Sequence, residues 1–600
     1  MYDQIRNIGG NAKSSMRTLV RTAAVWVGPR SIPFDLVRIY AFSLIVTFFF
    51  LYFGDITVEH GSYDYVHVAQ AIIGDWDFGG RPPQGPWGRD IGMALVWLIS
   101  GYQFTQSLTG VIVIQAVMAI TMPVLAYLSL QPWLPRTAYW TALAATLSLA
   151  PVLMMKTIHH DQPYIFFTVV SLYLFNRYML TKLPRYLYAV TGALFAVGLV
   201  RQAGYGQFWP LMPICWWRGG NRSLKHIALA AVVFAGGSMA YAKYRNSLMG
   251  EFGVPGVSIF HNFYVNMAEY GVALDPDMGP NVELILGRVR ECALPSPAES
   301  ESLRKWPGPH DYIDKIFFDN TTDELVAKVA SQSNLQYFFF IVSCVGGKRD
   351  YGTLDRILMG ASIEIARTHP QFVLRLFFRN SLELLYNPGW LHNTYESRPQ
   401  FQGGLLFPFG DIGTLRDGGP MYDDRFPQRN QNEASFIPLE RQRRLIASVY
   451  NSIYQTWYGY YHPVTVIVGI LSWLAWISTA IGICHSALGG PLLGRWSRVW
   501  LSERIVPASI GISVLLLENV AITAIAEETI YRYDYSLSML KIMLGGVGCA
   551  ALFALLSHLY RNIAPTLGGV CGVWRISKVG LRASTDLGVT ERRLGVESGC

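Results

Sequence analysis

Apolar blocks recur along this 600-residue chain and constrain its fold more than any other feature. Each block has roughly 18 to 25 residues, and a helix of about 20 residues crosses a hydrocarbon core of about 30 Å. Only 15% of the residues are charged, whereas soluble domains carry about 25%. This composition favours helices surrounded by lipid over one very large aqueous core.

The blocks predict an all-α polytopic membrane protein with about ten transmembrane helices. The predicted spans are residues 35–53, 104–130, 138–157, 163–180, 186–201, 205–217, 227–246, 460–484, 505–526 and 536–557. The fifth and sixth are short, so the segment 186–217 can be two crossings or one re-entrant pair.

Lysine and arginine near the ends of the blocks predict the orientation, because basic residues are retained on the cytoplasmic side. Basic residues precede the first block and then recur in alternate connections and in the C-terminal tail: Arg6, Lys13, Arg17, Arg21, Arg30, Arg136, Arg177, Lys182, Arg185, Arg218, Arg222, Lys225, Arg495, Arg498, Arg504, Arg561, Arg575, Lys578, Arg582, Arg592 and Arg593. Both termini are therefore predicted to be cytoplasmic, and the N-terminus does not read as a cleavable signal. The net charge of +8 reflects this pattern and not nucleic-acid binding.

This orientation divides the chain into five predicted parts. They are a basic N-terminal segment (1–34), a transmembrane module (35–246) with a first outer loop (54–103), an extracytoplasmic domain (247–459), C-terminal transmembrane helices (460–557) and a cytoplasmic tail (558–600). The extracytoplasmic domain is inserted between the seventh and eighth helices and is mixed in polarity but mainly helical, and its end is predicted to lie in the membrane interface. It holds Cys292 and Cys344, which can form one disulfide.

The first outer loop is rich in acids, and in its sequence "GDITVEHGSYDYVHV" Asp55 lies two residues beyond the end of the first span. Asp55, Glu59 and Asp64 therefore lie near the level of the lipid headgroups. Transfer of a sugar from a lipid phosphate needs a carboxylate there to accept the proton of the attacking hydroxyl. These three acids are the candidate catalytic bases, although a single acid in an outer loop is often only a solvated surface group.

The next outer turn, "IHHDQPY", adds His159, His160 and Asp161. These side chains can bind a phosphate, or His160 and Asp161 can hold a divalent metal such as Mg²⁺ or Mn²⁺ together with Glu59. Alternatively, they cap the start of the fourth span, where a proline suits the first helical turn.

Three arginines at predicted outer ends of spans are candidates for binding the donor phosphate: Arg89, Arg201 and Arg532. An arginine there either reaches out to lipid phosphates or clamps a substrate phosphate with its planar fork of donors. Arg201 lies between two short spans, where an interior site is expected.

The order of these features resembles the C-type glycosyltransferases (GT-C), bacterial membrane enzymes that take a sugar from a polyprenyl-phosphate carrier and include mannosyltransferases and aminoarabinose transferases. That family's first loop typically reads Asp-x-x-x-Tyr with a small residue four positions on. Here Tyr65 and Ala69 fit, and Gly61 occupies the position of the aspartate.

Two further signatures of the family are matched in part. Arg89, Asp90 and Gly92 fit one resembling Arg-x-Pro-Gly-Tyr-Pro without its proline and tyrosine, and the late signature Glu-x-Arg-Tyr-x-x-Pro is matched loosely around residue 530. The resemblance implies a multi-pass enzyme of the bacterial inner (plasma) membrane that binds membrane lipids. Its substrates would be a polyprenyl-phosphate-linked sugar and an envelope glycan, lipid or protein. The substrate-binding residues it implies are Tyr65, Asp90, Glu528 and Tyr531.

Two other functions remain open from the sequence. A polysaccharide polymerase or ligase also uses a lipid-linked donor, and its catalytic residues would lie in a large late loop such as "RPQFQGGLLFPFGDIGTLRDGGPMYDDR". A transporter would place ionisable groups near the bilayer midplane and often show repeated halves. Here only Glu518, with Asn519, lies well inside a predicted span, and no repeat is visible. The sequence favours a glycosyltransferase acting on the periplasmic face, with inversion at the transferred carbon.

Overall fold

The computed structural model describes residues 31–53, 65, 68–69, 91–105, 109–148, 150–153, 155, 160–249, 256–292, 322–331, 336–346, 351–386, 467–484, 498–526 and 531–568. Every regular element in these ranges is a helix, which confirms the all-α prediction. The chain divides into two units, Met1–Ala551 and Leu552–Cys600, and the second contains the end of α27 (Tyr531–Gly568).

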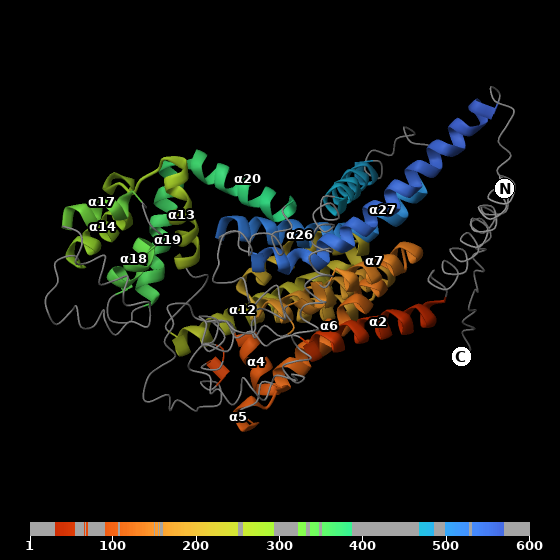
Figure 1. Cartoon of the computed structure of the whole chain (residues 1–600), viewed down its shortest axis with the longest axis horizontal. Helices are drawn as coiled ribbons and strands as arrows, with labels where there is room; N and C mark the ends of the chain where they lie inside the picture. Colours follow the sequence, from red (N-terminus) through yellow and green to blue (C-terminus); the bar gives the residue numbers. More distant parts are fainter. Residues whose placement is uncertain are drawn as a thin grey trace, which may run out of the picture. The chain divides into compact units, whose positions relative to one another are not determined.

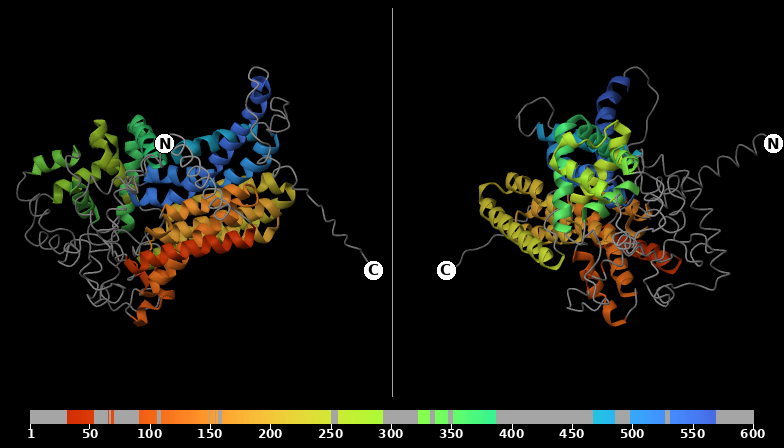
Figure 2. Two further views of the ribbon diagram at one scale, coloured as in Figure 1. Left: turned by 45° about the vertical axis from the view of Figure 1, so that its right-hand side comes forward. Right: turned by 90° about the vertical axis from the view of Figure 1, so that its left-hand side faces the viewer.

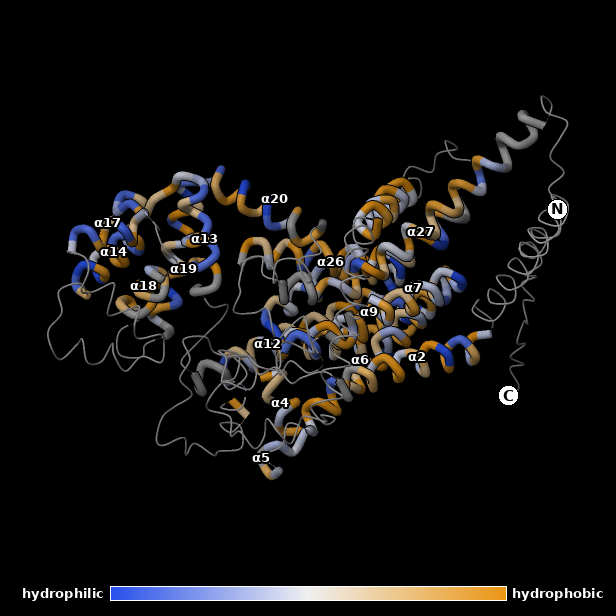
Figure 3. The backbone as a smooth tube through the Cα atoms, in the orientation of Figure 1, coloured by the Kyte–Doolittle hydropathy of each residue, from blue (hydrophilic) through white to orange (hydrophobic). Residues whose placement is uncertain are grey.

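Six helices in the described part are long and apolar enough to cross a membrane. They are α2 (Ile32–Phe53), α6 (Thr109–Leu130), α12 (Asn221–Met249), the helix Ile467–Cys484, α26 (Val506–Ala526) and α27. Hydrophobic residues follow α2, α6 and α26 along most of their length (Figure 3). The six correspond to six of the ten predicted spans, and they make the chain a polytopic membrane protein.

The other four predicted spans form shorter or more polar helices. They are α7 (Pro135–Leu147) with α8 (Ala150–Leu153), α9 (Asp161–Thr181), α10 (Pro184–Val200), and η1 (Gln202–Gln207) followed by α11 (Phe208–Gly219). The prediction of one continuous helix over 138–157 is wrong, because α7 ends at Leu147. α9 has 21 residues but includes Asp161, Asn176 and Arg177.

The predicted start of the second span at residue 104 is also wrong. The short helix α4 (Ile91–Ile99) is followed by α5 (Tyr102–Thr105), and α6 begins only at Thr109. Gly101 separates α4 from α5 with a φ of 72°, a left-handed conformation that glycine adopts without steric cost.

Local sequence explains where several of these helices begin and end. Proline opens α7 and α10, at the first helical turn where its missing N–H is not needed. Lys182 ends α9 in the left-handed conformation, and Gly220 separates α11 from α12 with a φ of 64°. These breaks turn the chain sharply, so α9 to α12 pack as neighbours.

The membrane helices share one hydrophobic core in which α9 packs against α6, α10, α11 and α26. Phe175 and Leu172 of α9 are fully buried. Gly511 allows α26 to approach them, because a Cβ at this position would lie 2.7 Å from the Phe175 ring. This close packing holds the N-terminal end of α9 in a fixed place relative to its neighbours.

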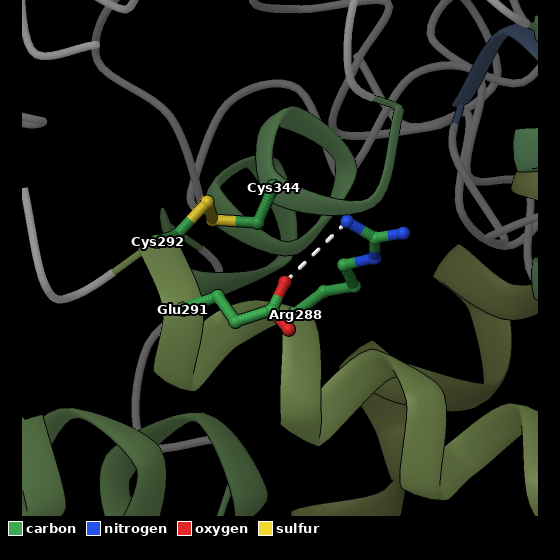
Figure 4. Close-up of a disulfide and its surroundings, with 4 residues drawn as sticks. All are labelled: Arg288, Glu291, Cys292 and Cys344. Atoms are coloured by element: carbon green, nitrogen blue, oxygen red, sulfur yellow. Dashed lines mark hydrogen bonds and ion pairs between the residues drawn. A yellow bond between two sulfur atoms is a disulfide. The ribbon is translucent and has the colours of Figure 1, made fainter.

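A second hydrophobic core is built by helices between residues 256 and 376 (Figure 1 and Figure 2). Its elements are α13 (Gly256–Met267), η2 (Ala268–Tyr270), η3 (Pro276–Met278), α14 (Pro280–Cys292), α17 (Thr322–Ala330), α18 (Gln336–Gly346), α19 (Tyr351–Thr368) and the first part of α20 (Pro370–Tyr386). Cys292 of α14 and Cys344 of α18 form a disulfide with Cα atoms 5.8 Å apart (Figure 4). The predicted pairing is confirmed.

Helix α20 joins the two cores. Phe372 and Leu376 belong to the second core, whereas Leu384 belongs to the core of the membrane helices. The amides of Asn262 and Asn380 donate hydrogen bonds to the carbonyl of Ala524, at 3.4 and 3.1 Å. They thereby satisfy a carbonyl that the C-terminal end of α26 leaves without an intrahelical partner. The boundaries 247 and 459 of the extracytoplasmic domain stay predictions.

Candidate active site

Four of the predicted site residues have described side chains: Tyr65, His160, Asp161 and Arg201. Seven others lie outside the described residues: Asp55, Glu59, Asp64, Arg89, Asp90, His159 and Glu528. Tyr531 and Arg532 are the first two residues of α27, and their side chains also lie outside the described part. The site is therefore built from the four described residues and their neighbours.

Tyr65 and His160 connect the first outer loop to the next outer turn. The Tyr65 hydroxyl and Nδ1 of His160 share a hydrogen bond, and the two rings meet edge to face with centroids 5.9 Å apart. Both side chains are buried, and Tyr65 packs in a cluster with Met93 and Trp97 of α4. Two loops that the sequence predicts to line one site are thus in direct contact.

His160 precedes α9 at the N-cap position, but its side chain makes no capping hydrogen bond. The alternative that His160 serves only as a cap of the fourth predicted span, which is α9, is therefore wrong. Its Nε2 lies 3.7 Å from Oδ1 of Asp161, a contact that is an ion pair when the imidazole is protonated. The imidazole consequently lies between a tyrosine hydroxyl and a carboxylate, and Asp161 is fully buried in the first turn of α9, where the helix dipole favours a negative charge.

Arg201 lies at the junction between α10 and η1, in an extended conformation that ends the first helix. Its side chain is buried, and the guanidinium carbon lies 5.4 Å from the centroid of the Tyr164 ring. Tyr164 comes one turn after His160 on α9, and residues four apart share a helix face. The same face of α9 thus carries the histidine and the aromatic ring that supports the arginine.

A hydrogen-bond network continues from Tyr164 into the C-terminal part of the chain. The Tyr164 hydroxyl donates to Oδ1 of Asn519 on α26 and accepts from Nε2 of Gln207 in η1 at 3.0 Å. Asn519 itself donates to the carbonyl of Leu515 at 2.7 Å. The residues Arg201, Tyr164, Gln207 and Asn519 therefore form one buried polar cluster contributed by α9, α10, η1 and α26.

Glu518 borders this cluster from α26. Neither carboxyl oxygen has a hydrogen-bond partner in the described part of the chain, and both are buried. One of them packs against Gly206 of η1, and Arg201 lies close enough to interact with the carboxyl group electrostatically. An ionisable group inside a spanning helix is costly and usually marks a functional site.

Sequence reasoning missed part of this cluster. It noted Glu518 and Asn519 as polar residues inside a span but assigned them no role, and it did not single out Tyr164 or Gln207. The polar pair within an apolar block was a usable signal. Nothing in the local sequence marks Gln207, whose partners come from other helices.

The predicted metal site is not assembled within the described residues. No three His, Cys, Asp or Glu side chains in that part of the chain come together in a way that could hold a metal ion. His160 and Asp161 offer two potential ligand atoms, Nε2 and a carboxylate oxygen. The third predicted ligand, Glu59, lies outside the described residues, so the metal stays a prediction.

The comparison with protein families agrees with this geometry. The model of the dolichyl-phosphate-mannose-protein mannosyltransferase family matches residues 81–243. The match supports a GT-C-type membrane glycosyltransferase. The matched region includes His160, Asp161, Tyr164, Arg201 and Gln207, and it supports a polyprenyl-phosphate-linked sugar as the donor. No significant match was found among curated proteins or among solved structures.

Proposed function

We propose that this glycosyltransferase moves a sugar from a polyprenyl-phosphate donor to a glycan, lipid or protein of the cell envelope, on the periplasmic face of a bacterial inner membrane. The observation that supports this most is the position of Arg201. It is a buried cation held over the ring of Tyr164, one helical turn after His160 at the start of α9.

Arg201 would bind the phosphate of the donor. Its guanidinium offers a planar fork of N–H groups that matches two phosphate oxygens, and a hydrogen bond between charged groups is stronger than one between neutral groups. Negative charge grows on this phosphate as the bond to the sugar breaks. A fixed cation in a site with little water therefore stabilises the transition state more than the ground state.

The proton acceptor would come from the first outer loop. In the sequence, Asp64 directly precedes Tyr65, whose hydroxyl shares a hydrogen bond with His160. In the proposed step, this carboxylate, or that of Glu59 or Asp55, takes the proton of the acceptor hydroxyl. The hydroxyl oxygen bonds to the anomeric carbon while the polyprenyl phosphate departs with the bonding electrons. One direct displacement of this kind inverts the configuration.

His160 and Asp161 would form the opposite wall of the site. The hydrogen bond between the Tyr65 hydroxyl and Nδ1 of His160 orients the imidazole and leaves Nε2 directed to the Asp161 side. We propose that this pair either contacts the donor phosphate or, with Glu59, holds a divalent cation such as Mg²⁺ or Mn²⁺.

The test is the replacement of Arg201. Arg201→Ala should weaken binding of the polyprenyl-phosphate sugar about 10- to 100-fold, the range expected when a hydrogen bond between charged groups is lost. Arg201→Lys should recover only part of this loss, because the fork geometry is absent. Donor binding is measured on the purified enzyme in lipid nanodiscs.

Arg185→Ala is the matched control. Arg185 is an exposed arginine on the first turn of α10 and also lies over an aromatic ring, that of Tyr186, at 5.1 Å. Its loss should leave donor binding unchanged. Normal donor binding by a folded Arg201→Ala enzyme would show that Arg201 only anchors α10, and the assignment of the phosphate site would be wrong.

A further inference from the structure

Helix α4 packs directly on the residue that precedes Arg201. α10 ends at Val200, and a Cβ at Gly92 of α4 would lie 2.6 Å from the Cα of Val200 and 2.7 Å from its backbone nitrogen. Backbone atoms cannot rotate away from such a contact, so only glycine allows α4 to approach this closely. α4, which belongs to the predicted first outer loop, is thereby fixed against the junction between α10 and η1.

The segment that follows Arg201 is also closely packed. A Cβ at Gly204 of η1 would lie 2.8 Å from the carbonyl carbon of Val197. A Cβ at Gly198 would collide with the Tyr205 ring. η1 therefore packs tightly against the last turns of α10. Arg201 lies between these two segments in an extended conformation, with a φ of −152°.

Tyr241 of α12 contacts both α4 and η1. Its hydroxyl accepts a hydrogen bond of 3.1 Å from the backbone N–H of Ile91, the first residue of α4. An N–H in the first turn of a helix has no partner within the helix, so this bond satisfies it. The Tyr241 ring also lies beside the Tyr205 ring of η1, with centroids 6.3 Å apart. One side chain therefore links the two elements that adjoin the Val200–Arg201 junction.

This packing determines where the Arg201 side chain begins. Binding of a phosphate by two parallel hydrogen bonds requires the position and the plane of the guanidinium to be fixed. The Tyr164 ring supports the far end of the side chain, with the guanidinium carbon 5.4 Å from the ring centroid. The backbone at Arg201 must be fixed as well, because a displacement of about 1 Å in an active site can reduce catalysis about 100-fold.

We propose that Gly92 and Tyr241 are positioning residues, which hold the backbone at Arg201 so that its guanidinium fits the donor phosphate. In this role they act through Arg201 and need no contact with the substrate. This inference rests on the proposed function, in which Arg201 binds that phosphate.

A double-mutant cycle tests the inference, because it separates an effect through Arg201 from a general loss of stability. Gly92→Ala should weaken binding of the polyprenyl-phosphate sugar roughly tenfold in the otherwise wild-type enzyme. In the Arg201→Ala enzyme, the same change should weaken binding no further, since the group that it displaces is already absent. Donor binding is measured on purified enzymes in lipid nanodiscs of one composition.

Tyr241→Phe is the second variant, and it keeps the aromatic ring beside Tyr205 while it removes the hydroxyl. It should weaken donor binding roughly two- to tenfold, the range for the loss of one neutral hydrogen bond. Again the loss should occur only in the enzyme that retains Arg201. Because the side chain keeps its shape, this variant tests the inference even where Gly92→Ala does not fold.

Matched controls lie on α10 and α12. Gly192→Ala adds a methyl group to α10 where a Cβ would meet no atom within 4 Å. Tyr188→Phe removes the hydrogen bond of 2.8 Å between Tyr188 and His226, which joins the two helices near their starts. Both controls should leave donor binding unchanged, whatever their effect on the melting temperature.

The outcomes separate this inference from the proposed function. Equal losses of donor binding with and without Arg201 would show that Gly92 and Tyr241 only stabilise the fold, and the inference would be wrong. Normal donor binding by both folded variants, together with weak binding by Arg201→Ala, would also overturn the inference but leave the phosphate site standing. Normal donor binding by Arg201→Ala would remove the assigned phosphate site, and the inference would fall with it.

Discussion

At the scale of single residues, Glu518 carries the most informative side chain in α26. Its two carboxyl oxygens are buried without a hydrogen-bond donor in the described part of the chain. A buried polar group left without a partner costs about 1 to 3 kcal/mol of stability. Proteins retain such a cost where the group serves a function, and Glu518 lies within electrostatic range of Arg201, the residue proposed to bind the donor phosphate.

Replacing this carboxyl group should therefore stabilise the fold. Glu518→Met keeps the length of the side chain and removes the unpaired oxygens, so it should raise the free energy of unfolding by about 1 to 3 kcal/mol. Thermal unfolding of the purified protein in detergent measures the change. Leu517→Met, at the next and lipid-exposed position, is the control and should have no effect. A lower melting temperature for Glu518→Met would show that the carboxyl group has a stabilising partner after all.

Residue by residue, the sequence allows part of the site to be predicted. Arg201 stands out as a positive charge at the predicted outer end of a span, and His160 stands out as part of a turn with a second histidine and an aspartate. The structure buries both side chains. Tyr164 and Gln207 could not be predicted. Tyrosines are common at lipid-facing positions of apolar blocks, so Tyr164 does not stand out in the sequence. The contacts of Tyr164 with Gln207 and Asn519 arise only when α9, η1 and α26 pack together.

At the scale of the elements, the segment after α10 shows both the strength and the limit of sequence patterns. The two short apolar blocks correctly predict a break near residue 201, and the structure places η1 there. The pattern could not show that η1 is a 3-10 turn, because that geometry depends on a tertiary contact. A Cβ at Gly206 would collide with Glu518, so a glycine is needed where η1 meets α26.

The disulfide between α14 and α18 gives a prediction at the same scale. Cys292 and Cys344 are 52 residues apart, and closing a loop of this size stabilises a fold by about 4 kcal/mol in the chain-entropy model. The double variant Cys292→Ser/Cys344→Ser should therefore make the helices between residues 256 and 376 more sensitive to protease at moderate temperature. The extent of cleavage against temperature measures the loss.

Two controls make this result specific. Cys484 is an exposed free cysteine in the helix Ile467–Cys484, and Cys484→Ser should leave protease resistance unchanged. A reducing agent should sensitise the wild-type protein but not the double variant. Equal resistance of the double variant and the wild type would show that the second hydrophobic core is stable without its cross-link.

At the scale of the whole molecule, hydropathy predicts the class of fold and the longest spans but not the path of every helix. The six spans that the structure supports are helices that combine sufficient length with a sufficiently apolar sequence. The remaining predicted spans form helices such as α9, most of whose residues are buried by other helices. Burial by other helices allows these elements to be shorter or more polar than a helix surrounded by lipid, so their lengths do not follow from the thickness of the bilayer.

The orientation of the whole chain is the remaining large-scale prediction, because it decides which compartment the active site faces. Both termini are predicted to be cytoplasmic from the basic residues before residue 31 and after residue 560, and Arg495, Arg498 and Arg504 mark another cytoplasmic connection. Alkaline phosphatase is active only outside the cytoplasm, so a fusion at residue 300 should be active, whereas fusions at residues 220 and 490 should be inactive.

The disulfide between Cys292 and Cys344 favours the same side for residue 300, because such bonds form in oxidising compartments. Activity at 220 and 490 together with inactivity at 300 would reverse the topology. It would also place the first-loop acids and the outer end of α10 in the cytoplasm, and the proposed periplasmic reaction would have to be abandoned.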